Sequence, residues 1–361
     1  MRILHFITSL RTGGAERLIV NVLPHLRDLG HTVAVLTMDG SRTHFTDVLQ
    51  QRGVPVESLS CGAAAMHNPM LLMRLRRFIR NGGYDIVHTH NSPCQILAAA
   101  AVPHGCSLIT TEHNTTNRRR SSSLWHPLDR MMYSRYKAII AVSEATADSL
   151  RAYLPSTSDK IHIVPNGIDA AAFCGADAAP DILSHFPGKK IIAMVAAFRP
   201  QKDHATMLKA LSMLPDDYTL VLAGDGDTLP AVRAEAAACG VSERVLFAGA
   251  RSDVGAVYAA ADVAVQSSHY EGFGLSAIEA MASGTPLIAS DVDGLRDTAT
   301  PGGILFPEGD AAALAHTIRA VCSNPSLQHT LAEAGRRRAQ DFDVTRTAQE
   351  YHNVYINTTL S

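Results

Sequence analysis

The chain lacks paired cysteines and a long apolar run, and we expect no signal peptide. None of its six cysteines lies in a C-x-x-C pair, which argues against a disulfide framework or a structural zinc site and fits a reducing cytoplasm. No apolar run approaches the roughly 18 residues that a membrane span needs, and polar residues interrupt the start too early for a signal peptide. We therefore expect a cytoplasmic protein that is soluble or at most lies on a membrane surface.

Neither sign of charge is in large excess over the whole chain, but the charge is unevenly distributed. The formal net charge of -2 hides 18 Lys and Arg against 11 Asp and Glu in residues 1–165, and 14 against 23 in the remainder. A hydrophobic content of 46% is typical of a packed globular protein. The basic first half and the acidic second half predict that the two halves meet different partners.

Strand-like apolar runs alternate with helical patterns twice along the chain. The first series begins with Arg2–Ile7, a glycine turn, a helix closed by Gly30 and a second strand, which is the βαβ order of a parallel sheet. The series restarts at 190–195, after a stretch rich in Ala, Gly, Pro and Asp. The pattern predicts two doubly wound α/β domains. The predicted domains are residues 1–170 and 171–344, with a helix over about 345–361 packing back on the first.

The stretch Ser268–Glu279 carries the strongest chemical signal. It follows a buried-strand pattern, contains two glycines in a turn and leads into a helix with an apolar face. The first amides and the dipole of such a helix favour an anion, and glycines let a phosphate approach the backbone. A carboxylate lies on each side, Glu271 in the turn and Glu279 in the helix. The stretch indicates a nucleotide-sugar site, with the role of the two carboxylates still open.

Two loops that follow other predicted strands carry polar residues. Arg199 and Lys202 lie three apart in one of them, where fixed cations can neutralise a diphosphate; an ordinary solvated pair is the alternative. Gly224 and Asp225 lie in the other. Asp225 and Asp227 formally match an acidic metal-binding pair, but the flanking glycines favour a tight turn beside a bound ligand. The sequence shows no persuasive metal-ligand spacing.

The first half has weaker candidates. Gly13 and Gly14 follow the first strand without a full G-x-G-x-x-G pattern, which argues against a dehydrogenase; they could meet a diphosphate or an acceptor, or form an ordinary turn. His113 ends a predicted strand, where ligands bind in such sheets, although a lone histidine is more often structural. His88 and His90 are expected to be structural.

Two basic segments could contact an anionic membrane surface. Residues 70–80 predict a basic amphipathic helix, and Arg118–Arg120 form a basic run near the only tryptophan, Trp125. A solvated face is the equally weighted alternative. Nucleic acid is disfavoured, because the second half is acidic and no binding module is recognisable.

Taken together, these motifs resemble those of the family 4 glycosyltransferases, which have the GT-B fold. The most specific part is the E-x7-E signature from Glu271 to Glu279 in the context Ser-x-x-Glu-Gly-Phe-Gly-Leu. Supporting motifs are Gly13-Gly14-Ala15-Glu16, Pro165-Asn166-Gly167-Ile168-Asp169, Phe198-Arg199-Pro200-Gln201-Lys202, Gly224-Asp225-Gly226 and Gly303-Ile304-Leu305-Phe306-Pro307. The resemblance implies two Rossmann-like domains facing each other across a cleft.

The resemblance also implies a reaction: retaining transfer of a sugar from a nucleotide diphosphate donor, UDP-linked in the first instance, without metal or cofactor. Arg199 and Lys202 are expected to hold the diphosphate, Glu279 the ribose and Glu271 the donor sugar. The remaining expected site residues are His113 by the donor sugar, Arg251 near the base, Gly13 and Gly14 on the acceptor side, and Gly224, Asp225, Gly272, Phe273, Gly274 and Leu275 around the donor.

One segment departs from the family pattern, and the acceptor stays open. Residues Asp291–Asp297 replace the paired glycines and glutamate that the family often shows, which leaves the donor sugar undetermined. We expect a glycan or polyprenyl-linked acceptor of surface polysaccharide synthesis at the inner face of the cytoplasmic membrane. The alternatives are a nucleotide-sugar 2-epimerase of the same fold and a non-catalytic nucleotide-sugar binder.

Overall fold

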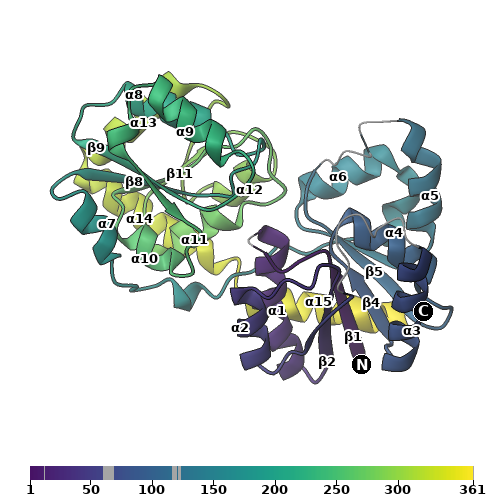
Figure 1. Cartoon of the computed structure of the whole chain (residues 1–361). Helices are drawn as coiled ribbons and strands as arrows, with labels where there is room; N and C mark the ends of the chain where they lie inside the picture. Colours follow the sequence, from purple (N-terminus) through teal and green to yellow (C-terminus); the bar gives the residue numbers. More distant parts are fainter. Residues whose placement is uncertain (12, 60–68, 116–119, 121–122, 361) are drawn as a thin grey trace. The chain divides into compact units, whose positions relative to one another are not determined.

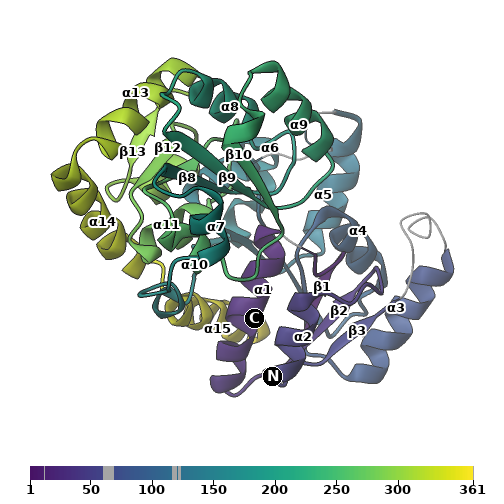
Figure 2. The same cartoon turned by 60° about the vertical axis from the view of Figure 1, so that its left-hand side comes forward.

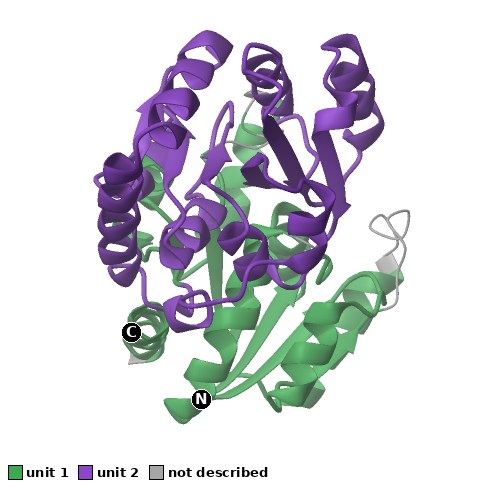
Figure 3. Ribbon diagram, turned by 90° about the vertical axis from the view of Figure 1, so that its left-hand side faces the viewer, with its two compact units in different colours: residues 1–167, 344–361 green, residues 168–343 purple. Residues whose placement is uncertain are grey.

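The computed structural model describes the chain except residues 12, 60–68, 116–119, 121–122 and 361 (Figure 1). The chain divides into two compact units, coloured separately in Figure 3. Unit 1 comprises Met1–Gly167 and Val344–Ser361, and unit 2 comprises Ile168–Asp343. Among the described residues, no helix is long and apolar enough to cross a membrane.

Unit 1 is built on a parallel sheet of seven strands. Their order across the sheet is β3-β2-β1-β4-β5-β6-β7, and every pairing is parallel. The central strands are buried on both faces, as expected when helices cover both sides of a parallel sheet. The strands are β1 (Arg2–Ile7), β2 (Thr32–Thr37), β3 (Val56–Ser58), β4 (Ile86–Thr89), β5 (Ser107–Glu112), β6 (Ala138–Ala141) and β7 (Ile161–Ile163).

Two layers of helices cover this sheet. Ile3 and Ile7 of β1 pack with α1, α2 and the C-terminal α15, whereas Leu4 and Phe6, on the opposite face, pack with α3, α4, α5 and α6. Figure 1 shows α15 in yellow beside α1. The C-terminal helix is therefore part of the first core. The helices are α1 (Gly14–Asp28), α2 (His44–Gln51), α3 (Pro69–Gly82), α4 (Ser92–Ala101), α5 (His126–Ser134), α6 (Glu144–Tyr153) and α15 (Val344–Leu360).

Unit 2 repeats the architecture with six parallel strands. Their order is β10-β9-β8-β11-β12-β13. As in unit 1, the chain adds strands first on one side of the unit's first strand and then on the other. The β10–β9 pairing shifts register between Phe247 and Gly249. The strands are β8 (Lys190–Val195), β9 (Tyr218–Ala223), β10 (Val245–Gly249), β11 (Val263–Gln266), β12 (Leu287–Ser290) and β13 (Ile304–Phe306).

The helices of unit 2 again form two layers. Apolar residues of α8, α9 and α13 share one core with the sheet, while α10, α11 and α12 contact strands β8, β11 and β12. Figure 2 shows α13 beside β12 and β13. The helices are α7 (Pro180–His185), α8 (His204–Ser212), α9 (Leu229–Ala238), α10 (Val254–Ala259), α11 (Leu275–Ser283), α12 (Leu295–Ala299), α13 (Ala311–Cys322) and α14 (Pro325–Gln340).

The strand order creates a switch point in each sheet. The winding reverses between β1 and β4 in unit 1 and between β8 and β11 in unit 2. Ligands of open α/β sheets bind outside the carboxyl ends of the strands at such a point. The loop with Arg199 and Lys202 follows β8, and the loop with Glu271 follows β11, so both flank the switch point of unit 2.

Candidate active site

Hydrogen bonds join the two loops at the switch point of unit 2. The Asp203 amide donates to the Ser267 carbonyl at 3.2 Å, and the His269 amide donates to the Gln201 carbonyl at 3.0 Å. The Gln201 side chain donates to the Tyr270 carbonyl at 3.0 Å. These bonds hold the loop after β8 against the loop after β11, although the two lie about 70 residues apart in the chain.

Lys202 and Glu271 form an ion pair at this junction. The Lys202 ammonium donates to Glu271 Oε1 at 2.5 Å, and only 13% and 10% of the two side chains are exposed. Gln201 donates to the other carboxylate oxygen at 2.7 Å. Both oxygens of Glu271 are thus oriented, and its charge is compensated next to the turn that was predicted to bind an anion.

Arg199 is the exposed cation of the same loop. Its backbone carbonyl accepts from the Lys202 amide at 2.9 Å, which closes the turn between the two cations. Within the described part of the chain, its guanidinium has no hydrogen bond or ion pair to another residue. A guanidinium held on a rigid turn and open to solvent can bind the oxygens of a phosphate.

The helix α11 begins at the end of the Glu271 turn. Gly274 precedes its first residue with φ +94°, a left-handed conformation that favours glycine. It offers no side chain to cap the helix, and the first turn contains no acidic residue. The first amides and the positive end of the dipole therefore lie beside the turn. Glu279 lies further along this buried helix, with 2% exposure.

The turn at Gly224 and Gly226 packs against the Arg199 loop. A Cβ on Gly224 would lie 2.0 Å from the Ala196 carbonyl oxygen, and one on Gly226 would lie 2.3 Å from that of Phe198. The Phe198 amide donates to the Asp225 carbonyl at 3.0 Å. Close backbone approach thus accounts for both glycines, and the turn supports the loop that carries Arg199.

The segment that departs from the family pattern supports the Glu271 turn. Gly294 has φ +79°, and a Cβ on it would lie 2.5 Å from the Glu271 carbonyl oxygen and 2.8 Å from that of Gly272. Arg296 pairs with Asp291 and, at 3.1 Å, with Asp293. Arg296 therefore compensates only part of the negative charge of this segment next to the turn.

Arg251, predicted near the base, is held by two carboxylates. Its guanidinium pairs with Asp181 at 2.6 Å and with Asp253 at 2.7 Å. The side-chain hydrogen bonds to Asp181 and then Asp253 raise the pKa of Arg251 further above its usual range. Arg251 thus links α7 to the start of α10, and its predicted contact with a base stays a prediction.

In unit 1, the predicted glycines lie at the start of α1. Gly13 is extended and precedes the helix, and Gly14 is its first residue. The position that a Cβ of Gly13 would take is 2.1 Å from an oxygen of the Glu16 carboxylate. A side chain at 13 would displace Glu16, which gives this glycine a local packing role besides its predicted contact.

His113 and three other histidines of unit 1, His5, His88 and His90, form a cluster that the sequence did not reveal. His113 follows β5, and its Nε2 lies 3.2 Å from Nδ1 of His90. His5, His88 and His90 are buried side by side, with ring nitrogens of all three within 4.8 Å. The expectation that His88 and His90 are satisfied side chains is confirmed, because each makes hydrogen bonds through both ring nitrogens. His5 was missed because it lies over 80 residues away.

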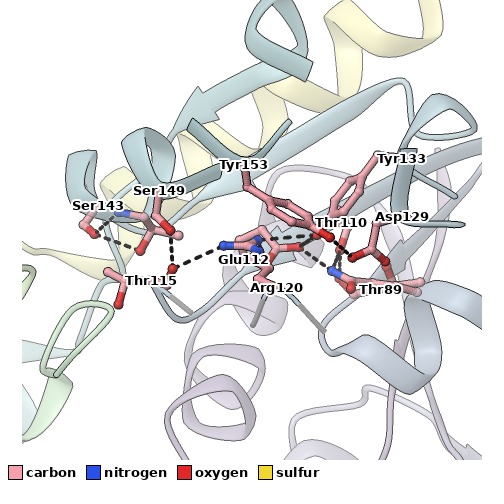
Figure 4. A network of polar contacts seen from close by, with 12 residues as sticks. Thr89, Thr110, Glu112, Thr115, Arg120, Asp129, Tyr133, Ser143, Ser149 and Tyr153 are labelled. Atoms are coloured by element: carbon pink, nitrogen blue, oxygen red, sulfur yellow. Dashed lines mark hydrogen bonds and ion pairs between the residues drawn. The ribbon is translucent and has the colours of Figure 1, made fainter. Parts of the chain in front are cut away.

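A polar network surrounds Glu112, next to His113 in sequence (Figure 4). Arg120 donates to Glu112 at 2.8 Å, and their side chains are only 5% and 7% exposed. The Tyr133 hydroxyl donates to the other carboxylate oxygen at 2.7 Å. Arg120 therefore faces the protein interior, where Glu112 supplies the anion that a buried cation needs. It does not belong to the basic surface predicted for 118–120. Arg118 and Arg119 lie outside the described residues.

The predicted basic helix is confirmed as α3. Leu71, Leu75 and Ile79 are buried in the core of unit 1, so the apolar face of the helix packs on its own sheet. The opposite face is exposed and carries the basic side chains together with Met70 and Met73. The exposed residues with basic side chains are Arg74, Arg76, Arg77 and Arg80.

Comparison with known proteins identifies the class. The family model described as Glycosyltransferase Family 4 matches residues 12–172, and the model described as Glycosyl transferases group 1 matches residues 176–338. The structure of Anabaena Alr3699/HepE in complex with UDP and glucose superposes with a TM-score of 0.86 at 22% identity, over 98% of both chains. Sucrose-phosphate synthase from Thermosynechococcus elongatus gives 0.83 at 21% identity, over 99% of both chains. The protein is a glycosyltransferase with the GT-B fold.

Relatives of known name indicate the family within this class of enzyme. A phosphatidyl-myo-inositol mannosyltransferase of Mycobacterium leprae is 29% identical over 95% of this chain and 92% of its own length. The putative glycosyltransferase EpsF of Bacillus subtilis is 29% identical over 80% of this chain and 79% of its own. The two family models together span most of the sequence. The chain belongs to the family 4 glycosyltransferases.

Proposed function

We propose that unit 2 binds a nucleotide diphosphate sugar, with UDP as the expected nucleotide. The enzyme transfers the sugar with retention of its anomeric configuration. The observation that carries this proposal is the convergence of three features at one switch point. These features are the exposed Arg199 guanidinium, the buried Lys202–Glu271 pair and the start of α11. Together they suit an anion attached to a polar, hydroxyl-rich group.

In the proposed complex, each group has a distinct role. Arg199, Lys202 and the amides at the start of α11 stabilise the departing diphosphate. Glu271, oriented by Gln201 at 2.7 Å, accepts hydroxyls of the donor sugar, and Glu279 accepts those of the ribose. His113 of unit 1 contacts the donor sugar.

The chemical step is dissociative. The bond from the anomeric carbon to the diphosphate oxygen breaks first, and the acceptor hydroxyl attacks from the face that the diphosphate leaves. The leaving phosphate accepts the proton of that hydroxyl. Catalysis is therefore electrostatic and positional. Because two side-chain cations and a helix terminus compensate the phosphate charge, we propose that transfer needs no metal ion and no cofactor.

We further propose a glycan or polyprenyl-linked acceptor at the inner face of the cytoplasmic membrane. One relative is a phosphatidyl-myo-inositol mannosyltransferase, whose name points to a lipid acceptor. The exposed face of α3, with Arg74, Arg76, Arg77 and Arg80, suits anionic headgroups. Sedimentation with anionic liposomes at low salt tests this part, and equal recovery with neutral liposomes contradicts it.

The donor is tested by thermal shift with glucose and mannose each linked to UDP and to GDP. A true donor stabilises the folded protein in proportion to its occupancy, and Arg199→Ala is expected to abolish that shift. The same donors are then incubated with acceptor extracts in EDTA, and the anomeric configuration of the product is read by NMR. An epimerised sugar released without acceptor indicates the 2-epimerase alternative, which family membership disfavours. Donor binding without turnover indicates a non-catalytic binder.

A further inference from the structure

A row of hydrogen bonds runs from α15 through the sheet of unit 1 to His113. The Tyr355 hydroxyl lies 3.4 Å from Nε2 of His5, and Nδ1 of His5 lies 2.8 Å from Nε2 of His90. Nδ1 of His90 in turn lies 3.2 Å from Nε2 of His113. His5 lies in β1, and His90 directly follows the neighbouring strand β4 at the switch point. His5 and His90 thus each use one ring nitrogen for the preceding member of the row and the other for the next.

The imidazoles of this row are neutral. Burial lowers the pKa of His5 to about 3 and that of His113 to about 4. Burial first, and then the neighbouring histidines, lower the pKa of His90 well below its usual value. A neutral imidazole has one donor nitrogen and one acceptor nitrogen. The direction of one hydrogen bond therefore determines the direction of every bond in the row.

The Tyr355 hydroxyl determines that direction. It lies 2.7 Å from Nδ1 of His88 and 3.4 Å from Nε2 of His5. Because O–H donors make shorter hydrogen bonds than N–H donors, the two distances favour donation from the hydroxyl to His88 and acceptance by its oxygen from His5. His5 then accepts at Nδ1 from His90, and His90 accepts at Nδ1 from His113. All three rings of the row carry their proton on Nε2, the form that a free imidazole side chain prefers.

We propose that Tyr355, His5 and His90 are positioning residues that hold His113 as its Nε2–H tautomer, so that His113 offers Nδ1 to the sugar donor as a hydrogen-bond acceptor. This inference rests on the proposed contact of His113 with the donor. Across the described residues, Nδ1 of His113 makes no hydrogen bond to the protein, and His113 is partly exposed while His5 and His90 are buried. The row therefore ends at the one ring that a ligand can reach.

The spacing of His5, His88 and His90 would also allow a metal ion. Their ring nitrogens, however, already pair with one another or with Tyr355, Thr111 and His113 at 2.7–3.4 Å. A metal would have to break these bonds in the interior of the sheet. Zinc titration of the purified chain is therefore included as an arm of the test.

The test is ring NMR of the full chain labelled with ¹⁵N-histidine, with His113 assigned by its loss in His113→Gln. Tyr355→Phe removes the hydroxyl that accepts from His5. Tyr351→Phe is the matched control, because it makes the same change on the same helix. The Tyr351 hydroxyl contacts Thr111 at 3.0 Å, and its ring lies 6.0 Å from that of Tyr355, a contact that phenylalanine keeps. Melting curves of both variants establish that they fold.

In the wild type and in Tyr351→Phe, we expect His113 to carry its proton on Nε2. In Tyr355→Phe, the Nδ1–H form should rise by roughly fivefold, the worth of one net hydrogen bond. The donor KM should rise several-fold more than in the control while kcat stays similar, because the bond that is lost is made to the bound donor. An Nδ1–H ring in the wild type, an unchanged tautomer in Tyr355→Phe, or zinc binding that shifts these rings overturns the proposal. The expected tautomer change without any donor binding refutes the proposed function instead.

Discussion

Replacing Lys202 by methionine tests whether the ion pair with Glu271 contributes to the stability of the folded enzyme. The two side chains are 13% and 10% exposed, and removing one partner of a buried pair costs about 3–5 kcal/mol because the other charge stays buried. The slight exposure places Lys202→Met at the lower end, about 3 kcal/mol. Glu271 cannot easily turn to solvent, since Gln201 also holds it at 2.7 Å.

The double variant Lys202→Met/Glu271→Gln provides the control. Because it removes both charges, we expect it to recover most of the lost stability, as replaced buried pairs often do. Glu271→Gln alone should cost less than Lys202→Met, because a lysine side chain is flexible enough to move its ammonium toward solvent. The three variants form a double-mutant cycle that isolates the interaction.

Urea denaturation distinguishes the two units. Far-UV circular dichroism follows both units, whereas the single tryptophan, Trp125, lies in unit 1 and reports only on that unit. The dichroism transition of unit 2 should therefore shift while the fluorescence midpoint of Trp125 stays near the wild-type value. Additive losses in the double variant would refute the reasoning, because they would mean that the two charges do not interact.

Three further changes have outcomes that the structure determines. Arg199→Ala changes an exposed residue and should alter the free energy of unfolding by less than about 0.5 kcal/mol. Initial rates should nevertheless show that transfer is roughly a hundredfold slower. Wild-type turnover would exclude Arg199 from the site. Unit 1 should lose at least about 2 kcal/mol of stability between pH 7 and pH 5. The unfolded His5 imidazole, with a pKa of 6.5, binds a proton over this range while the folded one, at about 3, does not, and the lowered pKa values of His88 and His90 add to the loss. Trp125 fluorescence in urea would measure the sum, and a flat profile would contradict it. Gly294→Ala should destabilise unit 2 by about 1 kcal/mol or more beyond the control variant Gly309→Ala. Both glycines have a positive φ, but only at Gly294 would the new Cβ lie 2.5 Å from a backbone oxygen. Equal melting temperatures of the two variants would argue against that clash.

Most elements of the fold were predictable from local patterns. The strands at Arg2–Ile7 and Lys190–Val195 are confirmed as β1 and β8, because continuous apolar runs bounded by turn residues mark buried parallel strands. The strand β3 (Val56–Ser58) was missed, since three partly exposed residues at a sheet edge carry no clear periodicity. Helix α3 was predicted correctly, and its apolar face packs inward.

The sequence by itself determined the two α/β units and the loops after β8 and β11, because glycine turns, charge placement and hydrophobic period are local properties of the chain. Only the tertiary structure decided which charges meet. Lys202 pairs with Glu271 across 69 residues, Arg120 turns inward to Glu112, and Tyr355 reaches His5 across 350 residues. These contacts depend on the order of strands in each sheet and on which side chains of unit 1 meet α15, which no local pattern encodes.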